Sequence, residues 1–111
     1  MSHYYESDDL RKFGGIGEHG KALADDFFKY YGNVTGTDGA LTKREKALIA
    51  LAVSHAMKCP YCIDAYTTQC LETGSNPEQM MEAVHVAAAM QAGITLVHAV
   101  QMQNHLRKMV L

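Results

Sequence analysis

We predict an all-α fold for this chain, formed by about five helices in one domain that covers residues 1–111. Apolar side chains recur at spacings of three and four residues, which is the period of a helix with one buried side. Glycine, proline and asparagine separate these segments, and no segment alternates apolar and polar residues as a half-buried strand does. At 111 residues the chain is long enough to enclose a modest hydrophobic core.

Five helices are expected, at residues 19–31, 43–58, 60–73, 77–92 and 95–108. An arm or short turn over residues 1–17 precedes them, because that segment contains three glycines. The first helix has an apolar side rich in aromatic residues and should end at Gly32, where a loop over residues 32–40 begins. The second helix should start after Thr42, which forms the S/T-x-x-E pattern of a capping box with Glu45.

Proline, asparagine and glycine define the ends of the remaining helices. Pro60 is favourable at the first position of the third helix, and Gly74 can end that helix in the left-handed conformation. Asn76 can cap the fourth helix while Pro77 occupies its first position, and Gly93 should end it. The last helix finishes with basic side chains, which interact favourably with the negative end of the helix dipole.

Charge and composition argue against several classes of function. The net charge is −2 at pH 7 and the isoelectric point is about 6.3, and no cluster of Lys and Arg offers a phosphate-binding surface. Nucleic acid is therefore not an expected partner. The N-terminus lacks the basic and apolar layout of a signal peptide, and no run of about 18 apolar residues offers a membrane span. We expect a cytoplasmic protein that does not bind a membrane.

The main chemical motif is Cys59-Pro60-Tyr61-Cys62. Cytoplasmic thiols are kept reduced, so a close CxxC pair there is more often catalytic or metal-binding than structural. Cys59 falls at the N-cap of the third helix, where unpaired N–H groups and the helix dipole favour a thiolate. The dipole alone lowers a thiol pKa by roughly one unit, which favours a redox function for the pair.

Two other interpretations of the pair stay open. Cys59 and Cys62 could be buried structural residues, or they could bind zinc with His55, four residues before Cys59. Zinc normally takes four ligands, or three and a water, and the sequence contains no second CxxC and no H-x₃-H pattern. We therefore expect no metal and no other cofactor. His55 is then either a proton-transfer group that assists Cys59 or a hydrogen-bonded group in the core or at an interface.

Two expected helices are apolar on nearly all sides. They contain the segments ALIALAV and AVHVAAAM, in the second and the fourth helix respectively. A chain of this size cannot easily enclose two such helices, and surplus apolar surface usually marks an interaction site. We therefore expect a homo-oligomer.

The segment EKALIALAVSHAMKCPYCIDAYT, followed by a glycine-ended turn and a second alanine-rich helix, resembles the AhpD-like alkylhydroperoxidase branch of the carboxymuconolactone decarboxylase family. The resemblance covers residues 41–93 well and the rest loosely. It implies an all-helical fold assembled as trimers or hexamers, and a peroxidase whose disulfide is reduced by a dithiol carrier. The N-terminal Tyr4-Tyr5, Asp8-Asp9-Leu10 and Lys12-Phe13 further resemble a small peroxidase-like subgroup associated with arsenosugar biosynthesis.

The resemblance also implies roles for individual residues. By position, Cys62 is the thiolate that attacks peroxide and Cys59 is the resolving cysteine, whereas the helix-terminus argument favours Cys59 as a nucleophile in disulfide exchange. Strongly active members resemble one another in a histidine four residues after the second cysteine and a glutamate twelve residues before the first. Here these positions hold Tyr66 and Ala47. A tyrosine, with a pKa near about 10, can donate a hydrogen bond to a thiolate but is a poor base, so we expect weak peroxidase activity.

Two functions are consistent with these observations. The first is a thiol-dependent peroxidase or disulfide reductase, in which Cys59 and Cys62 act on a hydroperoxide or a disulfide, Tyr66 and His55 assist, and a dithiol supplies electrons. The second is a helical oligomer that binds an organic or arsenical ligand, or senses thiol oxidation, with little peroxidase activity. Thiolates are soft ligands, which suits trivalent arsenic.

Overall fold

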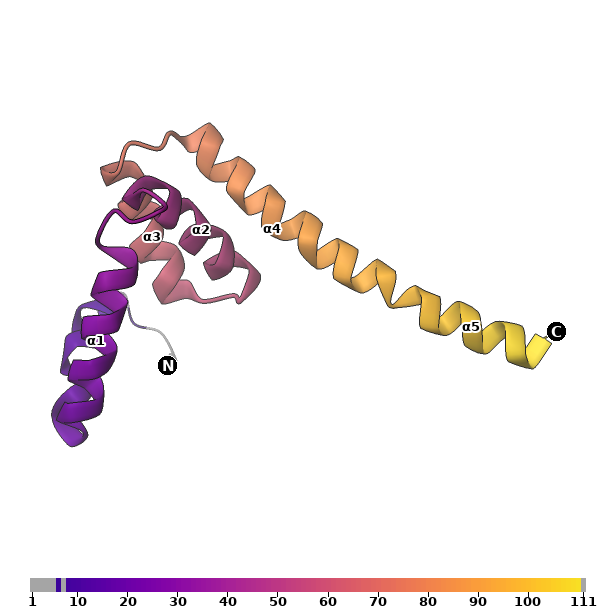
Figure 1. Ribbon diagram of the computed structural model, residues 1–111, viewed down its shortest axis with the longest axis horizontal. Coiled ribbons are helices and arrows are strands. Elements are labelled where there is room, and N and C mark those ends of the chain that lie inside the picture. The colour runs from indigo at the N-terminus through magenta and orange to yellow at the C-terminus, as the bar shows by residue number, and fades with distance from the viewer. Residues whose placement is uncertain (1–5, 7, 111) are drawn as a thin grey trace.

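The computed structural model describes residues 6 and 8–110, which form one 3₁₀ helix and five α-helices (Figure 1). Their bounds are Asp9–His19 for the 3₁₀ helix η1, then Lys21–Thr35, Lys43–Ala56, Pro60–Glu72, Pro77–Val97 and Ala99–Val110 for α1 to α5. These residues contain no strand. The all-α class and the five α-helices that the sequence predicts are confirmed, while Tyr4 and Tyr5 lie outside the described residues.

The predicted starts of α2 and α4 are confirmed by individual hydrogen bonds. The N–H of Glu45 donates to the Thr42 hydroxyl at 3.1 Å, and the N–H of Thr42 donates to the Glu45 carboxylate at 2.9 Å, which completes the capping box of α2. Asn76 and Gln79 form the same reciprocal pair at the start of α4. Gly74, between α3 and α4, has φ 97°, in the left-handed region that favours glycine.

Several helix boundaries differ from those expected, among them the start of α5, which is Ala99 and not residue 95. Residues 1–17 are expected to form an arm or a short turn, yet η1 runs for 11 residues. Helix α1 continues through Gly32, and α4 continues through Gly93. A glycine inside a helix costs only about 1 kcal/mol relative to alanine, so one glycine does not end a helix whose neighbouring residues continue it. Helix α1 ends at Thr35, and the N–H of the next residue, Gly36, donates to the carbonyl of Gly32 at 2.8 Å.

The hydrophobic core lies where α2 packs against α3 and α4. Ala47 and Leu51 of α2 and Cys70 of α3 are almost completely buried. Ala47 and Leu51 are four residues apart and therefore share one side of α2. The partly buried apolar side chains that pack against them come from all three helices: Leu48, Tyr66, Met80 and Val84. Cys70 is thus a small residue of the core.

Helix η1 packs against α1 through aromatic rings. The ring of Phe13 lies 5.0 Å from that of Phe28, 6.0 Å from that of Phe27 and 6.4 Å from that of Tyr31, measured between centroids. The tilted and edge-on geometries are those that aromatic pairs prefer. The aromatic side of α1 thus holds η1 in place, and η1 also contacts α3.

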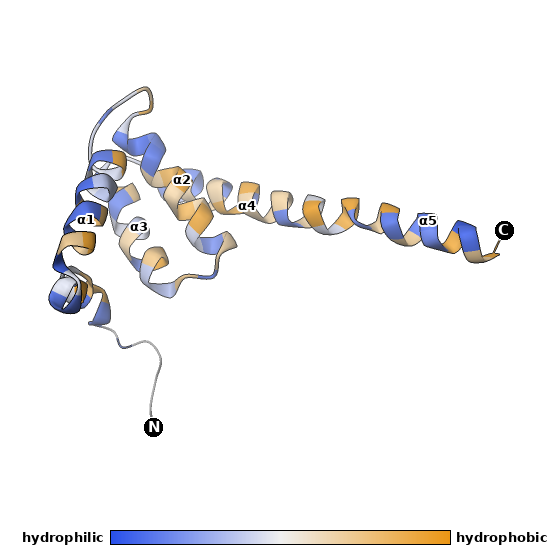
Figure 2. Cartoon of the chain, turned by 60° about the horizontal axis from the view of Figure 1, so that its bottom comes forward, coloured by the Kyte–Doolittle hydropathy of each residue, from blue (hydrophilic) through white to orange (hydrophobic). Residues whose placement is uncertain are grey.

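Helices α4 and α5 form an almost continuous rod that extends away from the other helices (Figure 1). The molecule is therefore elongated, with extents of 60, 35 and 34 Å. Ala87 is buried in α4, whereas no described residue of α5 is buried. Figure 2 shows hydrophobic residues along most of α4. By length and composition alone, residues 77–110 would suffice to cross a membrane, a feature that a search for about 18 consecutive apolar residues does not reveal.

Candidate active site

The turn between α2 and α3 places the CxxC motif at the start of a helix. Lys58 lies in this turn with φ 58°, and the N–H of Cys59 donates to the carbonyl of Ser54 at 3.0 Å. Cys59 is the N-cap of α3, as the sequence predicts, and its Sγ accepts the N–H of Cys62 at 3.3 Å. The helix start therefore offers the Cys59 sulfur a donor that stabilises a thiolate when the pair is reduced.

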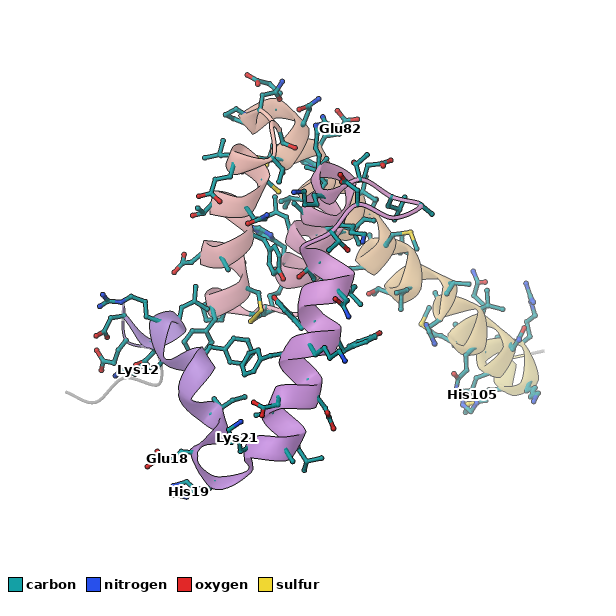
Figure 3. All side chains as sticks on the ribbon, turned by 60° about the vertical axis from the view of Figure 1, so that its left-hand side comes forward. Lys12, Glu18, His19, Lys21, Glu82 and His105 are labelled. Atoms are coloured by element: carbon teal, nitrogen blue, oxygen red, sulfur yellow. A yellow bond between two sulfur atoms is a disulfide. The ribbon has the colours of Figure 1, made fainter. Side chains whose placement is uncertain are left out.

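Cys59 and Cys62 are joined as a disulfide, with their Cα atoms 5.3 Å apart. Figure 3 shows the yellow sulfur–sulfur bond at the end of α3 that faces η1 and α1. The third cysteine, Cys70, is fully buried, and burial raises the pKa of its thiol. Of the three cysteines, Cys59 and Cys62 are therefore the two that a molecule from solution can reach.

A mostly apolar cavity of about 490 Å³ lies beside the disulfide. Its walls come from η1, α1 and α3, and the lining residues are Asp9, Leu10, Lys12, Phe13, Ile16, Tyr31, Cys59, Tyr61, Cys62, Ala65 and Tyr66. Both cysteines are thus in contact with a space that is large enough for a small organic molecule.

Tyr66 lies one helical turn after Cys62, and its hydroxyl is hydrogen-bonded to the hydroxyl of Tyr31 from α1. The Thr35 side chain also hydrogen-bonds to Tyr66, and the Thr35 hydroxyl donates to the carbonyl of Tyr31 at 2.8 Å. Burial is the main cause that raises the pKa of Tyr66, and the hydrogen bond with Tyr31 raises it further. Tyr66 therefore stays protonated at neutral pH, where it can donate a proton or a hydrogen bond but cannot accept a proton.

Tyr31 is a site residue that sequence reasoning missed. In the sequence, Tyr31 is one of several aromatic residues at helical spacing, and residues in such a pattern more often belong to a core than to a functional site. Nothing in a single sequence pairs Tyr31 with Tyr66, 35 residues later, because that contact depends on how α1 lies against α3.

His55 lies in the last turn of α2, away from the cavity lining. Its Nδ1 is 2.9 Å from the carbonyl oxygen of Leu51, so Nδ1 carries a proton and donates it to that acceptor. The structure therefore brings Cys59, Cys62 and Tyr66 together at one cavity, while His55 is hydrogen-bonded within its own helix.

Ala47, at the position where the resemblance places a glutamate, is 2% exposed. It belongs to the buried cluster against which Tyr66 packs. Positions 47 and 66 thus meet at the same part of the core, although neither holds a group that exchanges protons at neutral pH. Over residues 6 and 8–110, no group of three or more His, Cys, Asp or Glu side chains could hold a metal ion.

Asp9 connects η1 to the CxxC turn. Its carboxylate accepts the N–H of Glu6 at 2.9 Å and the Lys12 ammonium at 3.1 Å, and the side chain of Tyr61 also hydrogen-bonds to it. The bond from Glu6, then that from Lys12, and to a smaller extent that from Tyr61, lower the pKa of Asp9. Because Tyr61 lies between the two cysteines, this contact joins one wall of the cavity to the motif.

Comparison with known proteins identifies the family. The model of the carboxymuconolactone decarboxylase family matches residues 21–104, which include α1 to α4 and the CxxC motif. The chain belongs to this family. A protein of Paracoccus denitrificans, described as uncharacterized protein 4 in cox locus, is 45% identical over 86 residues, which cover 76% of this chain and 78% of that protein.

Two solved structures have the same fold. A protein from Methanobacterium thermoautotrophicum is 33% identical with a TM-score of 0.69, over 77% of this chain and 94% of its own. The apo form of a carboxymuconolactone decarboxylase family protein from Legionella pneumophila is 26% identical with a TM-score of 0.64, over 85% of this chain and 90% of its own. The AhpD-like resemblance fits this family, whose members include decarboxylases and peroxidases.

Proposed function

We propose that the protein is a thiol-dependent peroxidase of the AhpD-like type, which cycles between a Cys59/Cys62 dithiol and the disulfide. The observation that carries this proposal is the disulfide itself, which lies at the start of α3 and lines an apolar cavity. Redox-active cysteines have to be accessible to their substrates, and both of these cysteines are only partly buried. Membership of a family that includes peroxidases supports the same chemistry.

The proposed reaction starts with the Cys62 thiolate, which attacks the outer oxygen of a hydroperoxide ROOH. The O–O bond breaks, Cys62 becomes a sulfenic acid, and the alkoxide takes up a proton to leave as ROH. The Cys59 thiol then attacks the Cys62 sulfur, forms the disulfide and releases water. A dithiol donor returns both cysteines to thiols and is itself oxidised to a disulfide.

Tyr66 is the proton donor that the site offers to the alkoxide. Its pKa is raised, so the phenol keeps its proton at neutral pH, and it lies one turn after Cys62 at the same cavity. The same property prevents it from deprotonating Cys62. General acid–base catalysis contributes typically about 10²- to 10⁴-fold, and for that reason we propose a slow peroxidase. His55 donates through Nδ1 to Leu51, which leaves Nε2 as the nitrogen that accepts a proton, but His55 is not among the residues that line the cavity.

The test is a stopped-flow titration of the reduced protein with an organic hydroperoxide, in which free thiols are counted as the peroxide is consumed. We expect the loss of two thiols per peroxide and a disulfide within one peptide that spans Cys59 and Cys62. Cys62→Ser should abolish peroxide consumption, and Cys59→Ser should stop at a sulfenic acid on Cys62. Peroxide that leaves all three thiols intact, or a linkage to Cys70, would contradict the proposal.

The absence of His and Glu at positions 66 and 47 favours a second candidate function, that of a thiol-sensing or ligand-binding oligomer. In this alternative the dithiol exchanges with disulfides or binds an organic or arsenical ligand, and peroxide is not a substrate. The Cys59 sulfur, which accepts the N–H of Cys62, is then the exchanging nucleophile. Rapid reaction of the reduced protein with a small disulfide, without reaction with hydroperoxide, supports this alternative.

The remaining parts of the proposal concern partners and location. We propose a cytoplasmic homo-oligomer, a trimer or a hexamer, that receives electrons from a dithiol carrier and binds neither nucleic acid nor a membrane. The net charge of −2 supports the absence of nucleic acid, and the exposed apolar residues of α4 and α5 support the oligomer.

A further inference from the structure

We propose that Phe13 and Ile16 of η1 determine the substrate specificity of this site, because they hold the hydrocarbon group of an organic hydroperoxide beside the CxxC pair. This inference rests on the proposed function. It assigns a role to a segment outside residues 21–104, the range that the family model matches. The substrate preference of this chain would then depend on η1, which lies outside the residues that the family model matches.

Helix η1 contributes much of the cavity wall. Eleven residues line the cavity, and five of them belong to η1: Asp9, Leu10, Lys12, Phe13 and Ile16. The two cysteines, Tyr31 and Tyr66 line the same space. The reacting sulfurs and the apolar side chains of η1 therefore contact one bound molecule from different directions.

The size of the cavity favours a substrate with a hydrocarbon group. A water molecule occupies about 30 Å³ in the liquid, and hydrogen peroxide is only slightly larger, whereas the cavity measures about 490 Å³. Hydrogen peroxide would leave most of the apolar wall in contact with water. An aryl or branched alkyl group displaces that water, which is favourable in proportion to the apolar area covered.

The charges at the cavity favour an uncharged substrate. Asp9 and Lys12 are the ionisable wall residues of η1, and they pair with each other at 3.1 Å. Lys12, which Figure 3 labels on η1, is therefore already neutralised by a neighbour. Because the two charges of this wall offset one another, a carboxylate or a phosphate on the substrate gains little attraction there.

The wall is held in position before a substrate arrives. The Phe13 ring packs edge-on against Phe28 at 5.0 Å, and the Asp9 carboxylate holds η1 to Tyr61 of the motif. A wall that is already placed adds selectivity without the entropic cost of ordering a loop on binding.

The experiment compares cumene hydroperoxide with hydrogen peroxide. For each, kcat/KM is measured in the parent and in Ile16→Ala, Phe13→Leu and Leu23→Ala. Leu23 is 79% exposed on α1 and does not line the cavity, so it is the matched control. Removing part of an apolar pocket changes discrimination about 10- to 200-fold. We expect the ratio of the two kcat/KM values to fall at least about tenfold in Ile16→Ala and Phe13→Leu, and to match the parent in Leu23→Ala.

A binding measurement separates this inference from the proposed function. The alcohol product, 2-phenyl-2-propanol, is titrated into the oxidised protein, and the backbone N–H signals are followed by NMR. Shifts at Phe13, Ile16 and the CxxC turn that weaken in Ile16→Ala support the inference, even if the protein reduces no peroxide and the proposed function fails. A working peroxidase that treats both peroxides alike and shows no such shifts would overturn the inference and leave the proposed function intact.

Discussion

Tyr66 lies one helical turn after Cys62 and lines the same cavity. Its hydroxyl is hydrogen-bonded to Tyr31 and Thr35 of α1, so it connects the cavity to a second helix. Burial raises its pKa, and a phenol with a raised pKa is a donor at neutral pH. The residue therefore suits the protonation of an alkoxide better than the activation of a thiol.

The raised pKa of Tyr66 predicts a loss of stability at high pH. The unfolded tyrosine ionises near pH 10, whereas the folded one ionises at a higher pH. The folded state thus keeps its proton more tightly, and the resulting stabilisation is complete below about pH 10 and is lost as the pH rises above it. Urea unfolding at fixed protein concentration should show a steeper loss from pH 9 to 11.5 in the parent than in Tyr66→Phe. Tyr30→Phe, at a residue 70% exposed, should behave like the parent. Equal slopes in all three proteins would show that Tyr66 titrates normally.

Tyr66 and Ala47 stand where strongly active members of the family have a histidine and a glutamate. We predict that restoring both residues raises the peroxidase activity. Tyr66→His places an imidazole one turn from Cys62, and Ala47→Glu places a carboxylate in the cluster against which residue 66 packs. The double variant should raise kcat/KM for hydroperoxide at least about tenfold, and by more than the two single variants combined.

Stability is the necessary control in this experiment. Ala47 is 2% exposed, so an unpaired glutamate there should destabilise the fold unless the histidine pairs with it. Rates are compared only among variants with the helicity and assembly of the parent. A folded double variant that is no faster than the parent would show that proton transfer does not limit the reaction.

The sequence predicts the cysteines of the site better than the residues around them. Pro60 fixes the start of α3, and that start places Cys59 at the N-cap with Cys62 one turn later, all within four residues. Tyr31 bonds to Tyr66, and Asp9 bonds to Tyr61, only because the tertiary fold brings α1 and η1 to the cavity beside α3. Such contacts depend on tertiary packing, which a local pattern in one sequence does not specify.

At the scale of elements, helix starts that carry a capping side chain are predicted well, whereas helix ends marked only by a glycine are predicted less well. The starts of α2 and α4 carry side chains that accept specific backbone N–H groups, and these appear as recognisable spacings. Gly32 and Gly93 were expected to end helices, yet both lie inside them. Glycine destabilises a helix only modestly and does not force it to end, so a single glycine predicts a helix end less reliably than a capping side chain predicts a helix start.

The position of Gly32 inside α1 predicts a stabilising substitution. A Cβ at Gly32 would meet no atom within 4 Å apart from the nearby backbone of its own helix, so alanine fits there. Alanine also reduces the conformational entropy of the unfolded chain, which favours the folded state. We expect Gly32→Ala to raise the free energy of unfolding by about 0.5–1 kcal/mol. Gly36→Ala is the matched control, because its Cβ would lie 2.9 Å from the Gly32 carbonyl oxygen and should bring no gain. Thermal or urea unfolding of both variants tests this, and a gain at position 36 but not at 32 would contradict it.

At the scale of the whole molecule, the core is too small for the chain. Four apolar residues are buried, namely Ala47, Leu51, Cys70 and Ala87, among the residues described. Large apolar side chains along α4 and α5 are half or more exposed, among them Met90, Ile94, Val97 and Val100. An isolated domain of this length buries far more apolar surface, and a surface of this kind usually marks an interface.

We therefore predict that copies of the chain cover this surface for one another, through α4 and α5. Sedimentation at micromolar concentration without detergent should give a mass several times 12.2 kDa. Ile94 is 57% exposed in the single chain, so Ile94→Glu would cost little in a monomer but would bury a charge in an assembly. We expect this variant to dissociate or unfold, while Leu23→Glu, at a residue 79% exposed on α1, assembles like the parent. A folded 12.2 kDa monomer, or an Ile94→Glu variant that assembles normally, would contradict the prediction. A parent that stays in solution only with detergent would also contradict it, because residues 77–110 would then cross a membrane.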